Sequence, residues 1–125
     1  MTWRIEYDEA LSVIRCVYAG TVTAEDFRKG ALETIALAKK HNTHRILIDD
    51  SKLKSTVSTL EIYEMPGLYE AADANRRSKW ALILPPEGSI REDVNFYVTL
   101  CLNRGWFVKA FEDRRTAIDW LLGDP

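Results

Sequence analysis

Short apolar runs alternate with segments of helical periodicity along most of the chain, and this alternation most strongly limits the folds it can adopt. Trp3, Ile5 and Tyr7 alternate with polar neighbours, as in a strand with one buried face. A second strand is expected from about Ser12 to Ala19, and the short link favours an antiparallel hairpin. Helices and strands then alternate to the end, which requires crossover connections. The sequence therefore predicts one α/β domain over residues 1–125, with a mixed, mainly parallel five-stranded sheet and about four helices.

The helical segments carry start and stop signals. Residues of the N-cap type precede them at four places, namely Thr23, Ser58, Ser89 and Asp113. The first three are followed three positions later by an acidic residue, which is the spacing of a capping box. The first helix is expected to run for about 18 residues. The second should be kinked or split at Pro66, because proline lacks an amide donor and disfavours helix in the residue before it.

Composition excludes several classes of protein. With 46% hydrophobic residues and a formal net charge of −2, the chain is typical of a globular domain with one core, and its basic residues form no block longer than a pair. We therefore expect no nucleic-acid partner. No run approaches the roughly 20 apolar residues of a membrane span, and the first ten residues alternate in charge where a signal peptide would be apolar. A cytoplasmic location is the expectation.

No catalytic or metal-binding pattern stands out among the reactive side chains. Cys16 and Cys101 lie far apart in apolar surroundings and are expected to be reduced packing residues, while His41 and His44 belong to a helix end and its connecting loop. No phosphate-binding glycine loop occurs. We expect a protein without enzyme activity, metal or cofactor. A deep pocket holding Asp49 or Asp50 with a perturbed titration would instead favour an enzyme.

The stretch "RILIDDSKLKSTVST" brings polar side chains to the carboxyl end of a central strand, where open α/β sheets place their ligands. Its candidate phosphorylation, partner or ligand residues are Asp49, Asp50, Ser51, Ser55, Thr56, Ser58 and Thr59. Adjacent strand residues point to opposite faces, so the two aspartates should not share a metal ion, and one is expected to cap the loop. Ser58 has two interpretations: an anion or phosphate site at a helix start, or simply the N-cap paired with Glu61.

The segment "LEIYEMPGLYEAAD" is apolar on more than one side of the expected helix. A helix of this kind must bury both sides. Its candidate interface or groove residues are Tyr63, Met65, Leu68 and Tyr69. They could pack against a second copy of the chain, giving a homodimer, or flank a groove for an apolar ligand opened by Pro66 and Gly67. Simple exposure of a few of these side chains is the alternative.

Several of these segments together resemble a known family. The opening strand at Trp3, "VYAGTVTAEDF", "RILIDDSKL", "KWALILPP" and "RGWFVKAFEDRRTAIDWL" are similar to the STAS domain of anti-sigma factor antagonists, and more so to the SpoIIAA-like group of small bacterial proteins. The resemblance implies a STAS-like fold and a regulatory module that binds proteins. It also implies phosphorylation by a partner kinase at a serine heading the second helix. Ser58 is the nearest match, with Val57 where the family has an acidic residue.

Two hypotheses follow. In the first, the chain is a non-enzymatic STAS-like module that binds a protein partner, and a second copy of itself, through the loop and helix after the third strand. In the second, it carries or senses a small apolar or lipid-like molecule held beside the kinked second helix. The two differ in what covers the face that carries Tyr63, Met65 and Tyr69.

Overall fold

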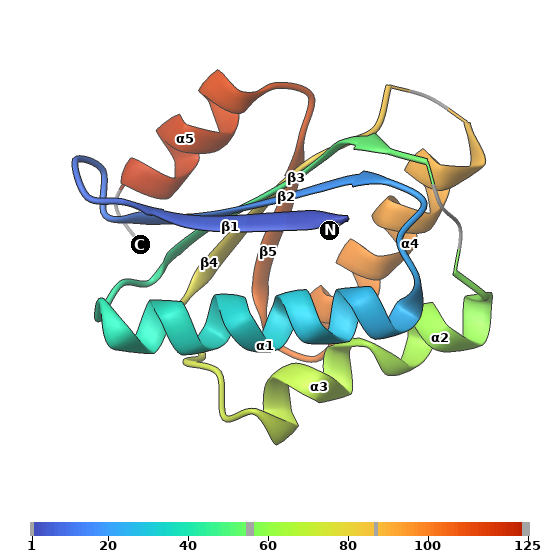
Figure 1. Ribbon diagram of the computed structural model, residues 1–125, viewed down its shortest axis with the longest axis horizontal. Coiled ribbons are helices and arrows are strands. Elements are labelled where there is room, and N and C mark those ends of the chain that lie inside the picture. Colours follow the sequence, from blue (N-terminus) through green and yellow to red (C-terminus); the bar gives the residue numbers. More distant parts are fainter. Residues whose placement is uncertain (1, 55–56, 87, 124–125) are drawn as a thin grey trace.

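A computed structural model of the chain describes residues 2–54, 57–86 and 88–123, and its centre is a single mixed sheet (Figure 1). The strands are β1 (Trp3–Asp8), β2 (Val13–Gly20), β3 (Arg45–Leu53), β4 (Lys79–Ile83) and β5 (Phe107–Phe111). They lie in the order β1-β2-β3-β4-β5, with β1 antiparallel to β2 and every later neighbour parallel. The predicted hairpin and mainly parallel α/β sheet are confirmed.

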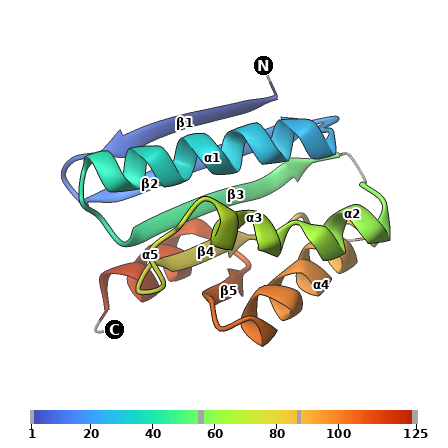
Figure 2. The ribbon, with the colours of Figure 1, turned by 90° about the horizontal axis from the view of Figure 1, so that it is seen from below.

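The helices cover the two faces of the sheet unequally. They are α1 (Ala24–Lys40), α2 (Thr59–Glu64), α3 (Pro66–Ala71), α4 (Ser89–Asn103) and α5 (Arg114–Leu122). The first four lie on one face, and α5 alone lies on the other (Figures 1 and 2). Each crossover between neighbouring parallel strands has the same hand, so the helices that make these connections fall on one side. The predicted break in the second helix is confirmed, because α3 begins at Pro66 directly after α2.

Local sequence explains most helix starts. The side chains of Thr23, Ser58 and Asp113 each accept a hydrogen bond from the amide three residues later, as predicted. The capping box predicted at Ser89 is wrong. Gly88 occupies the N-cap of α4 at φ 92°, a conformation that favours glycine, and Ser89 is already the first helical residue. The helix therefore starts one residue earlier than the predicted capping box requires.

The third strand is longer than its aliphatic run. The aliphatic run of this strand ends at Ile48, but β3 continues to Leu53. The pairing of β2 with β3 shifts between Val17, opposite Asp49, and Ala19, opposite Lys52, so β3 carries one extra residue there. Such a bulge lets pairing continue past a local irregularity. Asp49, Asp50 and Ser51 consequently belong to the strand.

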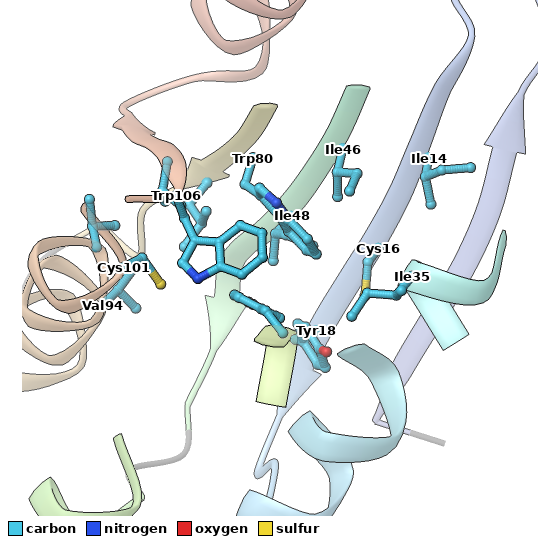
Figure 3. Packing of buried hydrophobic residues seen from close by; sticks show 14 of the residues in the cluster. Ile14, Cys16, Tyr18, Ile35, Ile46, Ile48, Trp80, Val94, Cys101 and Trp106 are labelled. Carbon is cyan, nitrogen blue, oxygen red and sulfur yellow. The ribbon is translucent and has the colours of Figure 1, made fainter. Parts of the chain in front are cut away.

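The sheet separates two hydrophobic cores, one on each face. The larger lies under α1, α3 and α4 and contains the two fully buried indoles of Trp80 and Trp106 (Figure 3). The smaller lies under α5 and contains only aliphatic side chains among its buried members, such as Leu47 and Leu121. Alternation along the central strands divides their side chains between the two cores, since Ile46 and Ile48 belong to the first and Leu47 to the second.

Candidate functional site

Asp50 continues the buried side of β3 into the larger core. Ile46, Ile48 and Asp50 alternate on the face covered by α1, α3 and α4, and only 5% of Asp50 is exposed. A carboxyl group at this depth is uncommon unless it is paired. Asp50 lies within the bulge of β3, and bulges often redirect a side chain next to a functional site.

Asp49 has a different environment. One of its carboxylate oxygens accepts hydrogen bonds from the amide of Ser51 at 2.9 Å and from the hydroxyl of Ser51 at 2.6 Å. It is half-buried, whereas Asp50 is fully buried. The two carboxyl groups are therefore separated by the pleat, and Asp49 is the member of the pair that stabilises local backbone.

A cavity of about 80 Å³ lies between the sheet and the helices beside Asp50. Its walls are apolar or aromatic apart from two carboxyl groups, and they come from β2, β3, β4 and the four helices of this face. The lining residues are Tyr18, Phe27, Ala31, Ile48, Asp50, Leu53, Val57, Ile62, Met65, Tyr69, Trp80, Leu82, Ile90, Asp93, Val94 and Tyr97. An apolar space with few polar groups is the usual form of a small-molecule site.

A groove of about 440 Å³ adjoins this cavity between α1 and the α2–α3 segment. The two spaces share the side chains of five residues, which are Phe27, Ala31, Met65, Tyr69 and Tyr97. These shared side chains place the groove next to the cavity. A ligand longer than the cavity could therefore extend into the groove.

The Asp50 carboxyl is buried without full hydrogen bonding, which disfavours its charged form. Among the described residues, its Oδ1 atom has no hydrogen-bond partner. Burial, together with the negative charge of the neighbouring Asp49, raises the pKa of Asp50 to about 7 from its ordinary 3.8. Near neutral pH, protonated and ionised Asp50 are thus both populated. Perturbed carboxyl groups in clefts are typical of binding or catalytic sites.

Aromatic rings form the wall facing Asp50. The ring of Tyr69 stacks on Trp80 with centroids 4.6 Å apart and meets Trp106 edge-on at 5.6 Å. Its hydroxyl is hydrogen-bonded to that of Tyr97, which ties α3 to α4 across the cavity. The aromatic cluster fixes the position of α3, whose six residues could not hold their place alone.

Comparison with known proteins decides the fold. No protein-family model matches the chain, and no curated protein matches it. Among solved structures, an uncharacterised protein of the DUF3478 family from Shewanella loihica, described as having a SpoIIAA-like fold, superposes with a TM-score of 0.59 at 21% identity. The superposition covers 95% of this chain and 91% of the other. The chain has a SpoIIAA-like fold. The resemblance inferred from the sequence is confirmed at this level.

The hydroxyl cluster after β3 of this SpoIIAA-like domain is only partly a cluster in space. Ser58 is the N-cap of α2: its Oγ accepts from the amide of Glu61 at 3.1 Å, and Glu61 Oε1 accepts from the amide of Ser58 at 3.0 Å. The hydroxyl of Ser51 donates a hydrogen bond to Asp49, and Thr59 is the first residue of α2. Ser55 and Thr56 lie outside the described residues. The geometry of Ser58 is that of a helix cap.

The apolar segment of the SpoIIAA-like fold divides between burial and exposure. Met65, Leu68 and Tyr69 line the groove, and Met65 and Tyr69 also line the cavity. Tyr63 lines neither, and 56% of it is exposed. The four predicted residues are thus not one surface: three belong to the groove, and Tyr63 points to solvent with Leu60.

Several residues of the site were not predicted from the sequence. Tyr18, Phe27, Asp93 and Tyr97 come from other parts of the chain and meet only through the crossovers. The available signal was Asp50 itself, which follows Ile46 and Ile48 at a spacing of two and therefore continues a buried face.

Metal sites and membrane-spanning helices are two further features to consider. Within residues 2–54, 57–86 and 88–123, no group of three histidine, cysteine or acidic side chains is placed to hold a metal ion. Over the same ranges, none of the helices combines the length and apolar character required to cross a membrane.

Proposed function

We propose that this SpoIIAA-like protein is a binding module without enzymatic activity, whose ligand is a small, mostly apolar molecule. The observation that carries the proposal is the cavity at Asp50, together with the apolar groove that adjoins it. A ligand that occupies this space would remove its apolar walls from contact with water, which is favourable.

The raised pKa of Asp50 is also the feature that would favour an enzyme. The groups around Asp50 therefore bear on the choice between catalysis and binding. A general base acts on a substrate with the help of a nucleophile or a second polar group. The nearest candidate nucleophile on this face, Cys16, is buried, and burial raises the pKa of its thiol to about 12. It stays protonated and weakly nucleophilic. Among the described residues, the lining offers carboxyl and phenol groups in an otherwise apolar wall, which suits binding better than group transfer.

The proposal is tested by native mass spectrometry of the protein purified from its own cells, before and after solvent extraction. A bound species that disappears on extraction is expected. Val94→Phe, which fills the cavity, should abolish retention of that species, whereas Leu102→Phe on the exposed side of α4 should not. Ligand-free protein under all growth conditions would argue against the proposal.

A second function rests on a different observation, the exposure of Leu60 and Tyr63. Both lie on α2, three positions apart and so on neighbouring parts of one helix face, with 66% and 56% exposed. Aromatic residues of this kind are enriched in interfaces. A protein partner, or a second copy of the chain, would dock on α2 as in regulatory STAS modules. Sedimentation of the wild type and of Leu60→Glu/Tyr63→Glu tests it, with Leu102→Glu as the matched exposed control.

A further inference from the structure

We infer that the cavity selects a positively charged amphiphile: a protonated amine that donates an N–H to Asp50, with its apolar part along the cavity wall and the groove. The inference rests on the proposed function and specifies the chemistry of the ligand. It depends on the charge of the lining, the unpaired carboxylate oxygen, the aromatic wall and the size of the cavity.

The charged groups around the site are predominantly acidic. The described residues that line the cavity include Asp50 and Asp93 and no lysine, arginine or histidine. The groove adds Glu61 and Glu64 against a single Arg28. A ligand with a carboxylate or phosphate head would bring like charges together in a poorly solvated space, which is unfavourable. The lining therefore disfavours fatty acids and phospholipid head groups and favours a cation.

The unpaired oxygen of Asp50 specifies a donor as well as a charge. A carboxylate oxygen can only accept hydrogen bonds, and burying it without a donor is costly. An alcohol supplies a donor without charge, and a quaternary ammonium supplies charge without a donor. A primary ammonium supplies both, and hydrogen bonds between charged groups are the strong ones.

The aromatic wall is suited to a cation. Tyr69 and Trp80 are stacked with their ring centroids 4.6 Å apart, and Tyr97 lies edge-on to Tyr69. All three rings line the cavity. Ring faces attract ammonium groups, and this attraction grows when the cation is desolvated. The same rings contact alkyl groups favourably, so one wall can accommodate both ends of a short amphiphile.

The volume limits how much of the ligand enters. Since about 10–15 Å³ of such space holds one water molecule, a cavity of about 80 Å³ has room for roughly six non-hydrogen atoms, which is an ammonium head and the first carbons of a chain. The rest must lie in the adjoining groove, past Met65 and Phe27. The shape therefore favours a linear chain over a compact polycyclic molecule.

Binding is coupled to one proton. When Asp50 is protonated, an ammonium ligand can pair with it only if that proton leaves for solvent. The titratable groups that face Asp50 are Cys16 and Tyr18 on β2, Tyr69 on α3, and Asp93 and Tyr97 on α4. Asp49 precedes it on the same strand, on the opposite side, and acts on it through its charge. Burial keeps the pKa of Cys16 near 12 and raises those of Tyr18 and Tyr69 well above their ordinary values, so these three stay neutral at physiological pH.

The test is isothermal titration of the full chain with three ligands of equal length: n-hexylammonium, n-hexanol and n-hexanoate. We expect n-hexylammonium to bind about tenfold or more tightly than n-hexanol, since a charged hydrogen bond contributes about 1.5–3 kcal/mol, and n-hexanoate to bind weakest. In Asp50→Asn the two affinities should agree within about twofold. Asp49→Asn, on the opposite side of the strand, is the matched control and should keep the preference.

A second measurement needs no variant. With a pKa of about 7, Asp50 is mostly protonated at about pH 6, so wild-type affinity for n-hexylammonium should fall about tenfold between about pH 8 and about pH 6. Affinity for n-hexanol should not change. Equal binding of amine and alcohol, unaffected by Asp50→Asn, would overturn the inference and leave the proposed function intact; a preference for n-hexanoate would do the same. If none of the three ligands binds, both are wrong.

Discussion

The two faces of the sheet are packed with different kinds of side chain. Under α5, the buried residues are Val13, Leu47, Ala81, Ile83, Ala117 and Leu121, all aliphatic. Under α1, α3 and α4, the buried set includes four aromatic side chains, three of which line the cavity. Within the described ranges, Asp50, Trp80 and Trp106 on this face each bury a polar atom without a hydrogen-bond partner. The α5 face is therefore filled by aliphatic side chains, while the other face leaves a cavity and buries polar atoms without partners.

The largest expected effect concerns the pH dependence of stability on the cavity face. The pKa of Asp50 is about 7 in the folded chain against an ordinary 3.8, so between these values the folded state holds a proton that the unfolded chain has released. Raising the pH through this window therefore destabilises the fold, by about 4 kcal/mol in total, with no further loss above about pH 7. Urea denaturation of the wild type and Asp50→Asn across this range, compared as a difference, measures it.

Taking the difference removes the other carboxyl groups. Asp26, Glu112 and Asp113 have lowered pKa values, because hydrogen bonds from Thr23, Arg91 and Thr116 respectively favour their charged forms, and they contribute the opposite slope at lower pH. Their contribution is the same in both proteins. A difference between wild type and Asp50→Asn that stays flat from about pH 4 to about pH 7 would show that Asp50 titrates normally and is not buried as described.

Truncating one leucine on each face compares packing directly. Leu121 on α5 is 1% exposed, and Leu82 on β4 is 3% exposed but lines the cavity. Leu121→Ala should cost about 3 kcal/mol, since it opens a new void in a filled core. Leu82→Ala should cost about 1 kcal/mol less, because its side chain already borders empty space and loses fewer contacts. Urea denaturation at one pH gives both values, and equal costs would mean that the cavity is filled.

The sequence predicts the strands and the helix caps better than it predicts the cavity. Period-two alternation and N-cap spacing depend on local contacts, and they predict the hairpin, the mainly parallel sheet and the caps at Thr23, Ser58 and Asp113. The cavity depends on which distant segments meet. Nothing local to Tyr18 or Tyr97 indicates that they share a wall with Asp50, because the crossovers bring them together.

Errors in the predicted boundaries have a physical cause too. The apolar run of β3 stops at Ile48, but strand pairing extends to Leu53. It does so because β2 continues to pair with β3 as far as Gly20. Hydrogen bonding between strands is a tertiary interaction, so the polarity of Asp49 and Asp50 could not end the strand. That extension is what carries Asp50 into the core.

Enlarging one buried side chain on each face should change the stability of the fold in opposite directions. Ala117→Val, on the filled α5 face, forces two extra carbons into a site with no exposed surface and should cost about 2 kcal/mol. Val94→Ile places one carbon in the cavity and should stabilise the fold by about 0.8 kcal/mol. Thermal unfolding of the two variants measures the contrast. Destabilisation by both would indicate that the cavity face is as tightly packed as the other.

The smallest effect compares the two caps, Ser58 at the start of α2 and Asp113 at the start of α5. Each side chain accepts a backbone hydrogen bond, so replacement by alanine removes about 1 kcal/mol in either case. Asp113→Ala should lower the global stability, because α5 packs as part of the smaller core.

Ser58→Ala should instead act locally. The six residues of α2 include the exposed Leu60 and Tyr63, so the helix can open while the sheet stays folded. Native-state hydrogen exchange should therefore show α2 amides exchanging about fivefold faster, with β3 and β4 amides unchanged. Ser58→Asp keeps an acceptor at the N-cap and should exchange at the wild-type rate. Faster exchange in Ser58→Asp as well would mean that a negative charge at this position opens the helix, which is how phosphorylation of Ser58 would act as a switch.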